Sequence, residues 1–168
     1  NLKVITQPTK LPLSIDIVKD YLRIDFDEED ALIEGMIGAA VTHAETFTRR
    51  SLAPRTYELT LNSFKDRVRL TKPPLIQVDS VVNENGQPIE YDILEDLGLA
   101  FVVFKDSYKK AVITYQAGYD ELPKPIEQAI LMLVAHFYEN REVAIVGTSV
   151  ERLPFSVEAL LYPYKGWF

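Results

Sequence analysis

The residues best suited to metal binding or catalysis are few in this chain. Its 168 residues include two histidines, His43 and His136, and no cysteine. A zinc enzyme generally supplies three protein ligands, and the spacing of a paired-histidine zinc motif is absent. Without cysteine there is no disulfide, no thiolate site and no thiol nucleophile. We therefore expect no metal site and no metal catalysis.

An acidic run is the next candidate for a binding site. Asp25, Asp27 and Glu29 alternate like the start of a calcium loop, but the sixth position of such a loop needs glycine and is Asp30 here. Acids also suit the first turn of a helix, where the helix dipole favours negative charge. We interpret Asp27 as a helix N-cap and the run as a helix start.

A serine near the C-terminus has part of the sequence of a hydrolase nucleophile. Gly147–Glu151 reads Gly-Thr-Ser-Val-Glu, which lacks the second glycine of a nucleophile elbow. No histidine follows Ser149, so the required order of serine, acid and histidine fails. The seven glycines form no phosphate-binding loop. We predict a protein that is not an enzyme, with no catalytic residues and no cofactor.

Composition and charge exclude further classes. The chain is 47% hydrophobic and 26% charged, which suits one domain or two small modules. Its formal net charge is −7, whereas affinity for nucleic acid comes mainly from Lys and Arg; a repressor or packaging enzyme is therefore excluded. No run approaches the roughly 20 apolar residues that span a bilayer. Asn1–Lys10 does not resemble a signal peptide, and the missing initiator Met suggests a trimmed chain.

Helical patterns occupy both ends of the sequence. The first helix is predicted from an N-cap at Ser14, with Leu13 and Val18 as a hydrophobic staple, to about residue 25. The second runs from Asp27 to about residue 50, the third from Pro125 to about residue 142, and a short one covers residues 156–161. Apolar residues recur at three- and four-residue spacing along the second helix: Leu32, Ile33, Met36, Ile37, Ala40, Val41, Ala44 and Phe47.

The middle of the sequence has the period of strands. Alternation from Arg55 to Leu61 predicts a half-buried strand, and the Asn85-Gly86 pair predicts a hairpin turn. Further strands are predicted at residues 75–82, 89–93, 99–104 and 111–115. The expected fold is therefore α+β: a helical bundle of three to four helices (residues 1–54 and 120–168) with an inserted small antiparallel β module (residues 55–119).

Aromatic residues are concentrated at the C-terminus. Phe155, Tyr162, Tyr164, Trp167 and Phe168 fall within the last fourteen positions, although chain ends are normally polar. Such a segment either folds back on its own core or docks into a partner, where Tyr and Trp are favoured anchors. The residues alone leave both readings open.

Several segments resemble one protein family. They are Leu13–Asp25 with Ala31–Ile33, Val112–Tyr119 with Leu122–Ala129, His136–Glu142, and Leu153–Tyr164. In this order they are similar to the head–tail connector (adaptor, or head-completion) proteins of tailed bacteriophages, over nearly the whole chain. Ser156 departs from the pattern, because glycine is expected there in the tail motif. Shorter family members lack the Arg55–Tyr115 strands, so the resemblance implies no role for them.

The resemblance implies a structural role in the virion neck. Such a subunit would form a ring with copies of itself, of twelve members, beneath the portal protein. The ring would continue the DNA channel without sequence-specific binding, present a platform to the next neck or tail protein, and assemble in the host cytoplasm. No membrane partner is implied.

The resemblance also implies which residues make contacts. Portal docking is expected of Phe155, Leu160, Leu161, Tyr162, Tyr164, Trp167 and Phe168. Packing between subunits is expected of Tyr138, Arg141, Glu142 and Val146. Two alternatives remain: another neck component, such as a stopper or tail-completion protein, and a small hydrolase or carbohydrate-binding module that uses the β insert.

Overall fold

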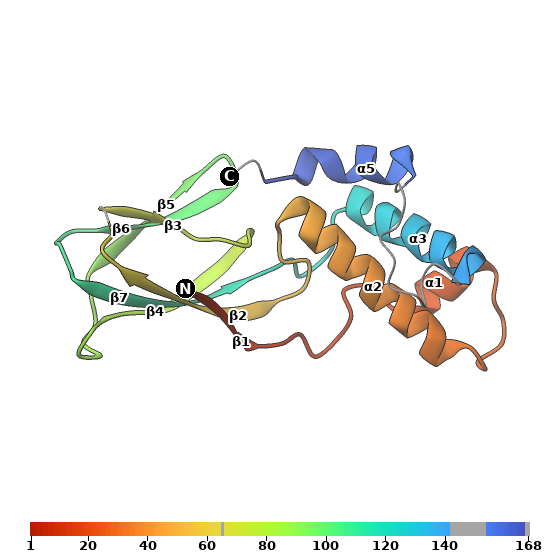
Figure 1. Ribbon diagram of the computed structural model, residues 1–168, viewed down its shortest axis with the longest axis horizontal. Helices are drawn as coiled ribbons and strands as arrows, with labels where there is room; N and C mark the ends of the chain where they lie inside the picture. Colours follow the sequence, from red (N-terminus) through yellow and green to blue (C-terminus); the bar gives the residue numbers. More distant parts are fainter. Residues whose placement is uncertain (65, 142–153, 167–168) are drawn as a thin grey trace. The chain divides into compact units, whose positions relative to one another are not determined.

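The protein divides into two compact units. The computed structural model describes residues 1–64, 66–141 and 154–166 (Figure 1). The strand unit comprises Asn1–Lys10 and Arg50–Asp120, and the helical unit comprises Leu11–Arg49 and Glu121–Phe168. The expected α+β class is confirmed. The division differs from the one expected, because residues 1–10, 50–54 and 120 belong with the strands rather than with the helices.

The first helix of the helical unit has the predicted start. Helix α1 spans Ile15–Leu22, and the Ser14 Oγ accepts a hydrogen bond from the Ile17 N–H at 3.4 Å. Leu13 and Val18 are both buried, as a hydrophobic staple requires. The helix ends at Arg23, which adopts the left-handed conformation with φ 59°.

The second helix starts differently from the prediction. Helix α2 spans Asp30–Thr48, and its N-cap is Glu29, whose side chain makes no capping bond. Asp27 and Asp30 instead accept hydrogen bonds from the Lys19 Nζ of α1, at 2.6 and 2.8 Å. The Asp27 cap was therefore wrong, because a cation from the preceding helix binds this carboxylate. These two bonds also raise the pKa of Lys19.

The remaining helices close the core of the helical unit. Helix α3 spans Lys124–Glu139 and α5 spans Phe155–Leu161, followed by the 3₁₀ helix η1 at Tyr162–Tyr164. Helix α3 packs against both α2 and α5. The fully buried aliphatic side chains at these contacts are Ile33, Ile37, Ile126, Ile130, Leu133, Val134, Val157 and Leu161. Burying each one stabilises the unit by about 1.5–3 kcal/mol before conformational entropy is counted.

The strand unit is built from two antiparallel sheets. The four-stranded sheet has the order β1 (Leu2–Thr6), β2 (Arg55–Asn62), β7 (Lys110–Ala117) and β4 (Leu75–Asn83). The three-stranded sheet has the order β3 (Arg67–Arg69), β6 (Leu99–Phe104) and β5 (Tyr91–Asp96). Strand β1 was not predicted; it pairs with β2 from Leu2 opposite Leu59, which explains why residues 1–10 join this unit.

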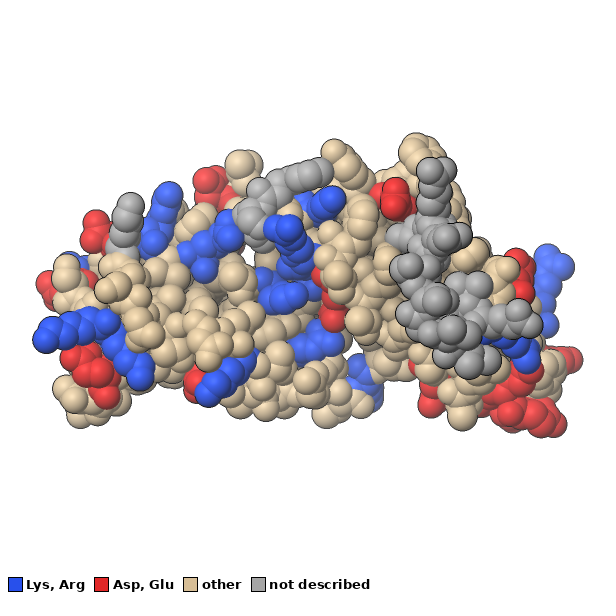
Figure 2. Space-filling model, viewed as in Figure 1, with Lys and Arg blue, Asp and Glu red and all other residues tan. Residues whose placement is uncertain are grey.

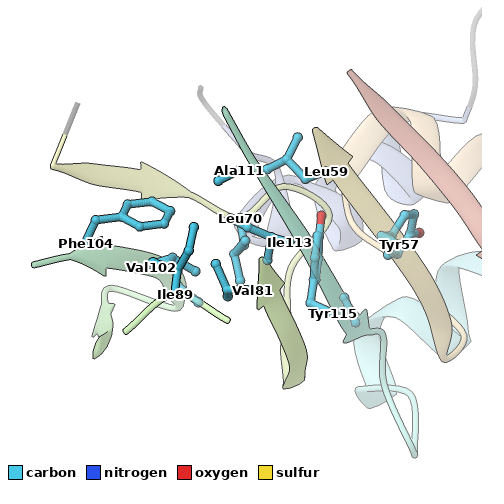
Figure 3. Close-up of a cluster of buried hydrophobic side chains, with 12 residues drawn as sticks. Tyr57, Leu59, Leu70, Val81, Ile89, Val102, Phe104, Ala111, Ile113 and Tyr115 are labelled. Atoms are coloured by element: carbon cyan, nitrogen blue, oxygen red, sulfur yellow. The ribbon is translucent and has the colours of Figure 1, made fainter. Parts of the chain in front are cut away.

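The core of the strand unit takes side chains from both sheets. Figure 3 shows residues of β2, β4, β6 and β7 gathered in one apolar cluster. Tyr115 lies fully buried in this cluster, stacks on Tyr57 with ring centroids 5.5 Å apart, and donates a hydrogen bond from its hydroxyl to the Thr71 carbonyl at 2.9 Å. Burial raises the pKa of the Tyr115 hydroxyl to about 12.

The predicted hairpin turn is present after β4. The Asn83 side chain accepts bonds from the N–H groups of Asn85 and Gln87, and Gly86 has φ 74°. The choice of residue is more restricted at Gly118. Its φ is 137°, and a Cβ would lie 2.4 Å from the Ala53 carbonyl oxygen. Only glycine allows the chain to leave β7 at this point.

Candidate partner-docking surfaces

The C-terminal segment folds back on the helical unit. Val157 and Leu161 of α5 are fully buried. Beyond η1, the Gly166 N–H donates to the Thr48 carbonyl oxygen at 2.9 Å. The Lys165 Nζ lies 4.9 Å from the centroid of the Phe47 ring, close enough for a cation–π contact. The segment is therefore held to the end of α2 through Gly166.

The same segment leaves two aromatic side chains in solvent. Phe155 is 85% exposed and Tyr162 is 55% exposed, whereas Leu160 and Tyr164 are half-buried. We call these four residues the tail surface. Leu161, which was expected at a docking site, belongs to the core instead because its position on α5 points it inward. Trp167 and Phe168 lie outside the described residues.

A polar cluster joins the start of α2 to the end of α3. The Tyr138 hydroxyl donates to the Glu29 Oε2 at 2.5 Å, and the Arg141 guanidinium donates to the Glu29 Oε1 at 2.7 Å. The Arg141 Cζ also lies 4.7 Å from the centroid of the Tyr138 ring. The Tyr138 bond and then the Arg141 bond hold the pKa of Glu29 below its usual value, and the bond to Glu29 raises the pKa of Tyr138.

Tyr138 and Arg141, which were expected to contact a neighbouring subunit, both belong to this polar cluster. The Tyr138 hydroxyl and one guanidinium nitrogen of Arg141 bind Glu29 of the same chain. Glu142 and Val146 lie outside the described residues. Sequence reasoning missed Glu29 as the partner, since more than one hundred residues separate it from Tyr138 and Arg141.

Several large apolar side chains of the helical unit lie at the surface. Ile17 and Tyr21, four residues apart on α1, are exposed, and so is Leu32 on α2. Their apolar stripes are wider than the surface that the neighbouring helices cover. Phe26, between α1 and α2, is also exposed. An apolar face on a small unit is a candidate contact for another chain.

Comparison with known proteins identifies the family. The model of the family described as "Phage gp6-like head-tail connector protein" matches residues 12–165. The chain belongs to this family. It is therefore a structural connector protein of the phage neck, as the sequence segments predicted, and the hydrolase and carbohydrate-binding alternatives gain no support. No curated protein sequence matches the chain.

Solved structures with a similar fold come from gene transfer agent (GTA) particles. A chain in the neck of an empty GTA particle, computed with C6 symmetry, has a TM-score of 0.81 and 22% identity, with 98% of the connector and 95% of that chain covered. A chain in the virion of a native particle has a TM-score of 0.78 and 23% identity, over 98% and 94%. A third, from a native neck computed with C12 symmetry, has a TM-score of 0.78 and 21% identity, over 98% and 94%.

Charge is divided unevenly between the two units of the connector. The helical unit contains 15 of the 25 acidic residues and 7 of the 18 basic ones, a formal charge of −8 against +1 for the strand unit. Figure 2 shows a group of acidic side chains on the helical unit at the lower right of the view. The net negative charge of the whole chain therefore resides in its helical unit.

The described residues offer little for metal or acid–base chemistry. Within them, no three His, Asp or Glu side chains lie close enough together to hold a metal ion. The His43 Nε2 is buried on α2 without a hydrogen-bond partner among these residues, and burial lowers the pKa of this histidine. No helix in this part of the chain is long and apolar enough to cross a membrane.

Proposed function

We propose that this connector forms a ring in the neck of a tailed phage or phage-like particle, beneath the portal protein. The ring would have twelve members, continue the DNA channel and present a platform to the next neck or tail protein. The family match over residues 12–165 carries this proposal. The fold supports it, because similar chains belong to GTA necks computed with C6 and C12 symmetry.

The tail surface is the proposed contact with the portal. Phe155 opens α5 and is almost fully exposed, while Val157 and Leu161 of the same helix are fixed in the core. An exposed aromatic on an anchored helix loses little conformational freedom when it docks, which favours its use as an interface anchor. Trp167 and Phe168 would extend this contact, and Tyr138, Arg141, Glu142 and Val146 would contact the neighbouring subunit.

The charge of the helical unit suits a channel through which DNA moves. A surface with a formal charge of −8 offers phosphates few cations to bind. A lumen lined by such a surface would let the genome pass without gripping it. We propose that the connector acts without catalysis and in this purely structural way.

The portal contact can be tested with the purified connector and the portal protein of the same particle. A variant with both Phe155→Ser and Tyr162→Ser should fold but bind portal more weakly. An aromatic anchor typically contributes about 2 kcal/mol to binding, so the affinity for portal should fall at least about tenfold. Asp106→Ser, which changes an exposed side chain in the β6–β7 connection, is the control and should bind portal like the wild type. Electron microscopy of the mixture reports whether rings form.

The outcomes separate the neck roles from one another. Rings of connector on portal, lost in the tail-surface variant, support the adaptor role. A connector that ignores portal but joins a ring of another neck protein would instead be a stopper or tail-completion protein. Full portal binding by the tail-surface variant would show that the portal contact lies elsewhere.

A further inference from the structure

The exposed apolar side chains of the strand unit are confined to its margins. Among the described residues of this unit, large hydrophobic side chains are exposed only on the edge strands β1, β4 and β5 and at the tip of the β5–β6 hairpin. They are Val4, Ile5, Ile76, Ile93, Leu94 and Leu97. The central strands β2, β6 and β7 present none. Exposed edges of this kind invite pairing with another strand unless something covers them.

The edge strands also carry charge of one sign each. Strands β1 and β3 bear Lys3, Arg67 and Arg69 and no acid. Strands β4 and β5 bear Asp79, Asp92, Glu95 and Asp96 and no base. Each sheet therefore has one basic edge and one acidic edge.

The two acidic edges lie on the same side of the strand unit. After the turn at Gly86, Pro88 forms a bridge with Val82, and the Ile89 N–H donates to the Val81 carbonyl oxygen at 2.9 Å. Strand β5 therefore begins beside β4. Strands β1 and β3 are the edges opposite β4 and β5 in their own sheets. We call β4 and β5 the acidic flank, and β1 and β3 the basic flank.

Leu97, at the tip of the β5–β6 hairpin, buries almost none of its side chain within its own chain. It is 95% exposed and has φ 48°, followed by Gly98 with φ 75°. Glycine or asparagine normally occupies such a position, because the left-handed conformation strains most other residues. The Leu97 side chain therefore gains almost no burial within its own chain. It is available to contact another molecule at one end of the acidic flank.

We propose that the acidic flank of one connector docks on the basic flank of a second copy, with β5 lying along β3 of the neighbour. Opposite charges and exposed apolar groups on the two flanks make them complementary. A contact between two different surfaces of identical chains is heterologous, and its repetition closes a ring when the rotation allows. This inference rests on the ring of the proposed function and assigns the strand unit a role in it.

The strand registers specify which residues would meet. Arg67 pairs with Val103, and Val103 pairs with Asp92, so Arg67 and Asp92 stand at the same level on opposite edges of one sheet. A sheet continued from one copy to the next would bring Asp92 of one beside Arg67 of the other. Backbone hydrogen bonds between edge strands would supply affinity, and the charges would set the pairing.

The absence of native cysteine makes disulfide trapping a direct test. Full-length connector with Asp92→Cys is mixed with connector with Arg67→Cys under mild oxidant. We expect this mixed dimer to form at least about tenfold faster, a preference of about 1.4 kcal/mol, than either like-with-like dimer. The matched control pairs Asp92→Cys with Lys109→Cys, an exposed site in the β6–β7 connection. Equal rates for the two mixed pairs would overturn the proposal.

Charge reversal gives a second, independent readout. A variant with Asp92→Lys, Glu95→Lys and Asp96→Lys has two basic flanks, and one with Lys3→Glu and Arg67→Glu has two acidic flanks. For this test the cysteines are placed at Ile93 of β5 and Val68 of β3, which both pair with Val102 and so stand at one level of the sheet. Each charge variant alone should lose the cross-linking preference, and mixing the two should restore it. A mixture that fails to restore the preference counts against charge pairing between flanks.

The trapping is repeated on connector assembled with portal, so that two failures can be told apart. Rings on portal that cross-link no faster than the control would remove this interface and leave the proposed function intact. Rapid cross-linking without any ring on portal would support the interface and remove the portal role.

Discussion

The Gly166 N–H donates a hydrogen bond to the Thr48 carbonyl oxygen at 2.9 Å, which ties the C-terminal segment to the last residue of α2. With Val157 and Leu161 buried in α5, the segment serves the fold through its inner side. Its outer side presents Phe155 and Tyr162 to solvent. Neighbouring substitutions can therefore change the buried inner side and the exposed outer side separately.

Neighbouring residues 161 and 162 should have different effects on stability. Leu161→Ala should lower the free energy of unfolding by about 2–5 kcal/mol, because it leaves a cavity between α5 and α3. Tyr162→Ala should change it by no more than about 0.5 kcal/mol, since the side chain is largely in solvent. Urea unfolding followed by circular dichroism measures both. Equal losses would mean that the segment is not packed as described.

The Glu29 cluster should make stability depend on acid. Because the folded pKa of Glu29 lies below its ordinary value of 4.5, its stabilisation is fully present above that value and is lost as the pH falls through the folded pKa. Glu29→Gln should therefore be less stable than the wild type near neutral pH, with the difference shrinking in acid. Urea unfolding from about pH 7 to about pH 3 measures this.

The control for this prediction is the adjacent Glu28→Gln, which changes an exposed carboxylate. Its stability should follow the wild-type curve across the same range. A Glu29→Gln difference that stays constant into acid would show that the carboxylate charge makes no contribution through Tyr138 and Arg141.

Tyr115 should make the strand unit sensitive to alkali. Its folded pKa of about 12 exceeds the ordinary 10.0, so the stabilisation of the neutral hydroxyl is complete below pH 10.0 and is lost as the pH rises toward 12. Tyr115→Phe should lose about 0.5–1.5 kcal/mol for each bond to Thr71 and should show a shallower decline over this range. If Tyr115→Phe declines as steeply as the wild type, another group causes the alkaline loss.

Two glycine substitutions should differ in cost. Gly118→Ala would place a Cβ 2.4 Å from the Ala53 carbonyl oxygen at φ 137°, so backbone must move in addition to strain of about 1–3 kcal/mol. Gly86→Ala meets nothing within 4 Å and should cost only about 1–2 kcal/mol for its φ. Thermal unfolding ranks the two variants. A milder effect at Gly118 would contradict the close approach of β7 to residues 53–54.

Local patterns were sufficient to predict elements that depend on neighbours in sequence. The Ser14 cap and the strand at residues 99–104 were predicted correctly, because capping and alternation are properties of a few adjacent residues. The Asp27 cap failed because Lys19, from another helix, binds that carboxylate. Strands β1 and β3 were missed for a similar reason: their pairing with Leu59 and Val102, respectively, cannot be read from five or three residues.

The proposed docking surfaces are harder to predict from the sequence than the fold is. Aromatic content pointed to the C-terminal segment, but only packing separates the buried Leu161 from the exposed Tyr162. The flanks of the strand unit left no pattern in the sequence at all. Arg67 and Asp92 lie on opposite edges of one sheet because each pairs with Val103 of β6. Strand β6 lies between them in space but follows both of them in the sequence.

The division into two units has a consequence for the order in which they fold during synthesis. Once a ribosome has passed Asp120, every residue of the strand unit exists, whereas α2 still lacks the cover of α3 and α5. Domains generally fold as units during synthesis, so β sheets precede the helical bundle. Phe155 and Tyr162 lie in elements that are made after both β sheets, so a chain that stops before residue 154 would contain the complete strand unit but neither of these exposed aromatic side chains.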